Sequence, residues 1–187
     1  MRFDTWAPLG LALIICATPF VVRSGYLLGM LNFIGLNAIA AMGLTLLMGY
    51  AGQVSLGQAA FFGLGAYTSG ILTATYGVNP WVAMGLAVLL TSSVAFVIGA
   101  PIFRLSGLLL AMATLGFGIV VYYVLVNWTG LTGGPSGLTG IPPLSLGGFR
   151  FDRDSRFFYL AWGGVLLFLV LALNLTNSRI GRALRAI

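Results

Sequence analysis

Eighty consecutive residues, positions 24–103, contain no Asp, Glu, Lys, Arg or His, and this stretch limits what the chain can fold into. Hydrophobic residues make up 59% of the 187 positions and charged residues only 6%, whereas soluble domains carry about 25% charged residues. A water-soluble fold would leave much of this apolar surface exposed, so the lipid bilayer is the solvent that fits the sequence. At about 20 residues per transmembrane helix, the uncharged stretch has room for about three spans.

Charged residues and turn signals divide the whole chain into six apolar segments. The predicted spans are residues 5–22, 27–48, 54–75, 81–103, 106–128 and 157–176. The first segment could also be a signal peptide, but it has no small-x-small cleavage site and further spans follow it, so we expect an uncleaved helix. The predicted fold class is all-α, a polytopic transmembrane helical bundle of about six spans.

Residues 129–156 differ from the rest because they are rich in Gly, Pro, Ser and Thr and end in a cluster of charges. We predict a Gly-rich loop outside the membrane, and loops of this length are often functional. With six spans, both termini lie on one side, and that side holds five of the nine basic residues. Since cytoplasmic segments carry the excess of Arg and Lys, we expect cytoplasmic termini and an external loop.

The missing residue types exclude several classes of function. The sequence has no His, no Lys and no Glu, so it lacks a Walker A lysine, a Schiff-base lysine and a histidine base or metal ligand. The single cysteine, Cys16, allows no internal disulfide and no zinc cluster. We therefore expect no enzyme activity and no metal or cofactor in this chain. Nucleic-acid binding is not expected either, because the Arg residues border apolar segments and are explained by membrane topology.

None of the predicted spans contains Asp, Glu, His or Lys, which argues against proton coupling through this chain. Sodium coupling stays open, because backbone carbonyls and hydroxyls can hold that ion. A source of energy outside this chain also fits the absence of these residues.

A polar segment interrupts the apolar sequence at positions 49–58, where Gln53, Ser55 and Gln58 stand among glycines. A buried amide without partners costs several kcal/mol in hydrocarbon, so these side chains face protein or water. Two interpretations remain open: a cytoplasmic turn with hydrated side chains, or a helix break at membrane depth that lines a pathway, as transporters build. The small residues that follow, at four-residue spacing over positions 59–70, predict a helix at the centre of the bundle.

Three segments carry a resemblance to a known family. The segment of residues 49–63 resembles the signature of branched-chain amino acid ABC transporter permeases of the Liv type. Residues 104–107, 114–118, 127–128, 131–137 and 140–142 resemble the LivM branch of that family. Residues 181–187 are similar to the start of the cytoplasmic loop by which these permeases contact their ATPases. The three segments occur in the same order as in the family and extend over most of the chain.

The resemblance implies a single transmembrane permease domain over residues 1–187, with the coupling loop starting at 178–187. In the family an acidic, Ala-rich coupling helix and further spans follow this point, so we expect the sequence to be the first part of a longer permease. The implied partners are a second homologous permease subunit, two ATP-binding subunits that hold the ATP, an extracytoplasmic substrate-binding protein and membrane lipid. The implied location is the plasma membrane of a bacterium or archaeon, as a multi-pass protein, and the inner membrane in a Gram-negative cell.

The residues and the resemblance together assign candidate roles to three groups of residues. Candidate substrate-pathway residues are Gly52, Gln53, Ser55, Gly57, Gln58 and Thr114. Candidate residues for coupling to the ATPase are Arg179, Gly181, Arg182 and Arg185, although the three arginines would also serve as positive-inside anchors. The external loop is represented by Gly133, Gly134 and Pro135.

The expected function is a permease subunit of an ATP-driven importer for branched-chain amino acids. Related permeases carry urea or short amides on a similar scaffold, so that substrate is the first alternative. An ATP-independent channel or facilitator is the second alternative, and a membrane assembly subunit that does not transport is the third.

Overall fold

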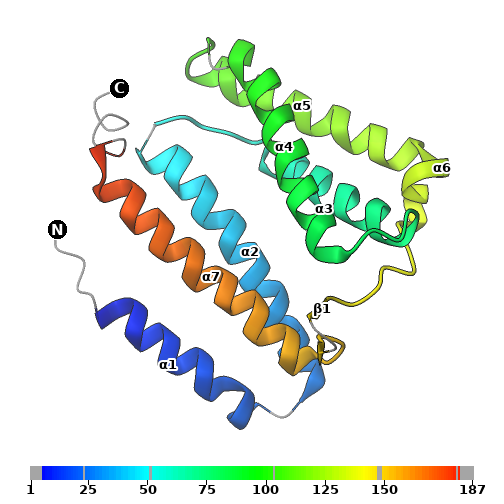
Figure 1. Cartoon of the computed structure of the whole chain (residues 1–187). Helices are drawn as coiled ribbons and strands as arrows, with labels where there is room; N and C mark the ends of the chain where they lie inside the picture. Colours follow the sequence, from blue (N-terminus) through cyan, green and yellow to red (C-terminus); the bar gives the residue numbers. More distant parts are fainter. Residues whose placement is uncertain are drawn as a thin grey trace. The chain divides into compact units, whose positions relative to one another are not determined.

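A computed structural model describes residues 6–22, 24–50, 52–102, 104–146, 149–179 and 181 of the chain. Figure 1 shows long helices joined by short connections. The helices are α1 (Trp6–Val21), α2 (Gly25–Tyr50), α3 (Gln58–Ala74), α4 (Pro80–Ile102), α5 (Leu108–Asn127), α6 (Thr129–Thr132) and α7 (Asp154–Asn177), with a 3-10 turn η1 (Gly134–Ser136) and two short strands, β1 (Ser145–Leu146) and β2 (Phe149–Arg150).

The six predicted spans all contain a long helix, which confirms the predicted fold class. Four of these helices, α2, α4, α5 and α7, are long and apolar enough to cross a membrane. Helices α1 and α3 have 16 and 17 residues, and at about 1.5 Å per residue they fall short of a hydrocarbon layer of about 30 Å. Helix α3 is short because residues 54–57, which were predicted to be helical, are not.

The chain forms two compact units, and the break before α3 lies at their boundary. The first unit consists of residues 1–52 and 151–187, and the second of residues 53–150. Each unit therefore has its own core.

In the first unit, α7 packs along α2 and also contacts α1. Leu28 and Phe158 are buried between these helices together with Ile15. Gly35 leaves room for the indole of Trp162, which would lie 3.3 Å from a Cβ at that position. The indole N–H of Trp162 donates a hydrogen bond of 3.2 Å to the Leu31 carbonyl. Trp162 thus helps to join α7 to α2.

In the second unit, α3 contacts α4, α5 and α6, while its place at the centre of the whole bundle stays a prediction. Its small residues allow these contacts. A Cβ at Gly63 would lie 3.3 Å from Leu125 of α5, and one at Gly65 would lie 3.6 Å from the Thr91 hydroxyl of α4. The rings of Phe61 and Phe117 also meet, with centroids 5.2 Å apart.

The predicted loop of residues 129–156 is partly folded. It contains α6, η1 and an antiparallel pairing of β1 with β2, in which Ser145 lies opposite Arg150. The Trp81 indole holds the loop at the start of α4 by donating a 2.7 Å hydrogen bond to the Ser145 carbonyl. The loop ends three residues earlier than predicted, because α7 begins at Asp154, an acidic residue that favours a helix N-terminus.

Candidate functional site

The polar segment between α2 and α3 is an irregular stretch of backbone that packs against the side of α5. The amide N–H of Leu56 donates a 3.0 Å hydrogen bond to the Thr114 hydroxyl. That hydroxyl in turn donates a 3.0 Å hydrogen bond to the Ala111 carbonyl within α5. The Thr114 side chain is buried, and it joins two segments that lie 58 positions apart in the sequence.

Gly57 makes this close approach possible. It is buried just before the first residue of α3, and a Cβ at this position would lie 3.0 Å from the Thr114 carbonyl oxygen. Because that neighbour is backbone, it cannot rotate away as a flexible side chain would. Gly57 therefore has a packing reason to be glycine, and the segment rests directly on α5.

The depth of the break follows from its contact with α5. Thr114 lies six residues after the first residue of α5, which is about 9 Å along the helix axis at a rise of about 1.5 Å per residue. Helix α5 is one of the candidate membrane spans. The break therefore lies beside a helix that is long and apolar enough to cross a membrane.

The other predicted pathway residues lie along the same stretch. Gly52 is exposed with a φ of 63°, a left-handed conformation that favours glycine. Gln53 and Ser55 are half-buried, and Gln58 is half-buried in the first turn of α3. The fold thus brings Thr114 of α5 to this segment. The segment itself belongs to positions 24–103, which contain no charged residue.

The predicted loop residues Gly133, Gly134 and Pro135 form a tight turn after α5. Gly133 and Gly134 have φ values of 78° and 61°, and a Cβ at Gly133 would overlap the Gly137 carbonyl. Pro135 lies in η1. The turn is anchored by Thr132, whose side chain is almost fully buried and whose hydroxyl lies 2.6 Å from the Leu125 carbonyl oxygen. The Gly134 N–H donates to the same hydroxyl at 3.2 Å.

Of the predicted coupling residues, Arg179 and Gly181 are among the described residues, and Arg182 and Arg185 lie outside them. Arg179 is exposed just past the end of α7. Gly181 is buried against that end: its N–H donates to the Ser178 hydroxyl at 3.3 Å, and a Cβ there would lie 2.5 Å from two carbonyl oxygens of α7. Gly181 therefore has a structural reason to be glycine whether or not it also contacts a partner.

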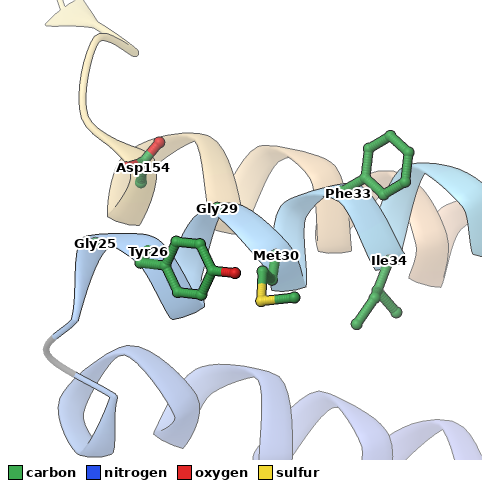
Figure 2. A pocket seen from close by; sticks show the side chains of 7 residues that line it. All are labelled: Gly25, Tyr26, Gly29, Met30, Phe33, Ile34 and Asp154. Atoms are coloured by element: carbon green, nitrogen blue, oxygen red, sulfur yellow. The ribbon is translucent and has the colours of Figure 1, made fainter.

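Sequence reasoning did not identify a hollow on the first unit. It has a volume of about 550 Å³ and is lined by the first part of α2, from Gly25 to Ile34, and by Asp154 of α7. Figure 2 shows Tyr26, Met30 and Ile34 in a row along one side of α2, with Asp154 beside the start of that helix. The small residues of α2 could have suggested a hollow, but the sequence does not show which face they occupy.

Neighbouring Asn32 is buried between α2 and α7. Its amide nitrogen donates a 3.1 Å hydrogen bond to the Asp154 carbonyl, while its side-chain oxygen has no partner among the described residues. The described residues also contain no group of acidic and cysteine side chains able to hold a metal ion.

Together, the long apolar helices, the uncharged interior and the interrupted span define a polytopic membrane protein of the kind that moves solutes. The chain belongs to the family described as branched-chain amino acid transport system, permease component, which matches residues 26–187.

Two curated relatives support this membership. The chain is 37% identical over 148 residues, or 79% of its length, to the high-affinity branched-chain amino acid transport system permease protein LivM of Salmonella typhimurium strain LT2. It has the same identity over the same length to the LivM protein of Escherichia coli strain K12. The matched region spans 35% of the length of each relative. No solved structure matches the chain.

Proposed function

We propose that this chain is a membrane-spanning permease subunit of an ATP-driven importer for branched-chain amino acids. Its partners would be a second homologous permease subunit, two ATP-binding subunits that hydrolyse ATP in the cytoplasm, and an extracytoplasmic binding protein that delivers the substrate. The importer would lie in a bacterial plasma membrane, the inner membrane of a Gram-negative cell. The names and bacterial sources of the two LivM relatives support this assignment.

The observation that carries the proposal is the interrupted span between α2 and α3. Irregular backbone at membrane depth is stable only where it is buried in protein or lines a water-filled cavity, and transporters place such breaks at their substrate sites. Here the segment is held against α5 by the Leu56–Thr114 hydrogen bond. Helix α3 then begins without a side-chain cap, so its positive N-terminal end is directed toward the break.

This arrangement suits a zwitterionic substrate. The half-buried side chains of Gln53, Ser55 and Gln58 offer neutral donors and acceptors, and the partial positive charge at the start of α3 favours a carboxylate. A pathway without fixed charges would hold the substrate weakly and release it readily. Affinity would then reside in the binding protein, and the energy for transport would come from the ATP-binding subunits.

The cytoplasmic end of α7 would pass this energy to the permease. Arg179 is exposed at that end, and Arg182 and Arg185 follow in the sequence. We propose that these arginines lie at the contact with an ATP-binding subunit, with Gly181 holding the chain close to the helix end.

Uptake of radiolabelled leucine by cells that express the assembled importer tests the pathway. Replacing both Gln53 and Gln58 by Leu removes two hydrogen-bonding amides, so uptake is expected to fall while the importer still assembles. Ser92→Leu, a polar-to-apolar change on the exposed face of α4, is the matched control and is expected to leave uptake unchanged. Normal uptake by the Gln53→Leu, Gln58→Leu variant would rule out these residues as the pathway. Competition by excess urea instead of valine would favour the urea alternative.

A further inference from the structure

The outward face of α2 carries a polar side chain where a lipid-facing helix would be apolar. Asn37 is the thirteenth of the 26 residues of α2, one of the candidate membrane spans. It is exposed, and its amide nitrogen donates a 2.8 Å hydrogen bond to the Phe33 carbonyl of its own helix. The Asn37 side chain makes no other hydrogen bond to the described residues.

Hydrocarbon is an unfavourable environment for this amide. Leaving a donor and an acceptor without partners in a bilayer costs several kcal/mol, which is why polar side chains inside membranes face protein or water-filled cavities. A lipid-facing position would therefore select against Asn37. On helix α4 the exposed side chains of Leu89, Phe96 and Val97 are apolar. The exposed polar groups of that helix are the small hydroxyls of Ser92 and Ser93, the second of which donates to the Leu89 carbonyl at 2.8 Å.

The hollow described above begins one turn away from Asn37. Phe33 and Ile34 lie at one end of it, and Asp154 lies at the other. Gly29 keeps it open, since nothing lies within 4 Å of the position where its Cβ would be. From Gly25 to Asn37 this face extends about 18 Å along α2 at a rise of about 1.5 Å per residue.

The charge at the far end of the hollow is available to a ligand. Asp154 is exposed, and the ion pair of this region joins its neighbours Arg156 and Asp152 at 3.4 Å. An apolar hollow with a carboxylate at one end and an amide beyond the other matches a small molecule that combines an ammonium group with an aliphatic side chain. A lipid tail would offer no partner to the Asp154 carboxylate or to the part of the Asn37 amide that does not bond to Phe33.

We propose that the face of α2 from Gly25 to Asn37 is the wall of a water-filled passage for aliphatic amino acids. This inference rests on the proposed function and extends it. The contacts are made one after another as the substrate moves along the face. Asp154 first attracts the substrate ammonium at the mouth, and Met30 and Ile34 then contact the aliphatic side chain. Further along, the Asn37 amide offers an acceptor to the ammonium and a donor to the carboxylate.

Thiol labelling tests whether the face is wet, independently of what is transported. Because Cys16 is the single cysteine of the sequence, Cys16→Ser provides a background free of thiols within it. A cysteine at Asn37 is then compared with one at Leu89, which is 65% exposed on the apolar face of α4. In the assembled importer, a membrane-impermeant, water-soluble thiol reagent is expected to label Asn37→Cys but not Leu89→Cys, and leucine is expected to slow the labelling. An unreactive Asn37→Cys would overturn the passage, because the residue would then face lipid or packed protein.

Transport measurements give the second readout. Asn37→Leu is expected to reduce leucine uptake about tenfold, the effect of losing one hydrogen bond to a charged group, while Asn37→Gln retains most of it. Asp154→Asn is expected to reduce uptake, and Asp152→Asn, which changes the exposed partner of Arg156, serves as its matched control.

If Asn37→Leu transports normally, the inference is wrong even though the proposed function stands. If the unaltered importer takes up no branched-chain amino acid but Asn37→Cys is labelled, the face of α2 does line a water-filled passage, and the proposed substrate is wrong.

Discussion

At the scale of single residues, one hydroxyl group determines how the break before α3 is held. The Thr114 hydroxyl accepts a hydrogen bond from the Leu56 N–H and donates one to the Ala111 carbonyl. A single buried group thus bonds both to the irregular backbone and to the carbonyl of its own helix. An unpaired N–H at this depth would be costly, because no bulk water is present to replace the partner. The side chain of Thr114 is therefore as important to the shape of the candidate pathway as the residues that line it.

Replacing Thr114 by Val tests this role with little change in volume. The Leu56 N–H loses its acceptor, and we expect a loss of about 1–3 kcal/mol in the free energy of unfolding, together with reduced uptake. Thr114→Ser keeps the hydroxyl and is expected to retain most of both. Thermal unfolding of the purified protein in detergent measures the difference. Equal stability of the Val and Ser variants would show that the hydrogen bond does not hold the segment.

The sequence identified only part of this residue-scale arrangement. Gln53 and Gln58 were predicted as pathway residues because amides are rare in apolar sequence. Thr114 was predicted from the family resemblance. The bond between Leu56 and Thr114 could not be predicted, since the two residues are 58 positions apart. Asn37 was missed because a single Asn in an apolar segment does not reveal whether it is buried, as Asn32 is, or exposed.

At the scale of helices, small residues decide which elements pack closely. In the first unit, Gly35 of α2 receives the indole of Trp162 of α7, and a Cβ at Gly164 would lie 3.5 Å from Ile39. Without a strong hydrophobic drive between helices in lipid, such close contacts and hydrogen bonds supply much of the association energy. The interface of α2 and α7 thus depends on glycine and on the hydrogen bonds that Trp162 and Asn32 donate.

Gly35→Leu is expected to separate α2 from α7. The added side chain would occupy the space of the Trp162 ring, and overpacking of this kind costs about 1–3 kcal/mol. Gly85→Leu is the matched control, because nothing lies within 4 Å of a Cβ at that position in α4. A lower midpoint of thermal unfolding for Gly35→Leu alone is the predicted result, and equal midpoints would contradict it.

The folded loop after α5 provides a further test at this scale. Thr132→Val removes the hydroxyl that contacts the Leu125 carbonyl and accepts the Gly134 N–H, so the turn is expected to loosen. Limited proteolysis of membrane vesicles should then cleave the loop faster than in the unaltered protein. Thr139→Val changes an exposed residue of the same loop and is expected to leave cleavage unchanged. Faster cleavage in both variants would mean that Thr132 has no special role.

Hydropathy and turn signals were sufficient to predict the helices but not all of their ends. The six apolar segments correspond to helices because each is long, apolar and bounded by charges or turns. Residues 54–57 were wrongly assigned to a helix, since their hydropathy continues into α3. Their irregular backbone depends on the contact with Thr114, which the sequence does not show. The loop was predicted only as a Gly-rich segment outside the membrane, and the sequence did not show that Gly133 and Gly134 support a specific turn.

At the scale of the whole molecule, the proposed function assigns the path to this chain and the supply of energy to other proteins. The interior of this chain lacks the acidic, basic and histidine residues that proton-driven carriers use. Positive charge is instead found near the cytoplasmic end proposed for α7, where an ATP-binding subunit would attach.

A crosslink tests the proposed attachment. A cysteine introduced at Arg182, in the Cys16→Ser background, is expected to form a crosslink to an ATP-binding subunit in the assembled importer. A cysteine at Thr139, in the loop expected on the opposite side, serves as the control and should form none. An assembled complex in which position 182 gives no crosslink would favour a simple anchoring role for the arginines.

The most direct test of the central claim is leucine uptake by proteoliposomes that contain this permease, its partner permease, the ATP-binding subunits and the binding protein. We predict uptake of radiolabelled leucine that requires both ATP and this chain, and that valine and isoleucine inhibit. Uptake that proceeds equally well without ATP would identify a facilitator, and uptake that persists when this chain is omitted would show that it is not the permease.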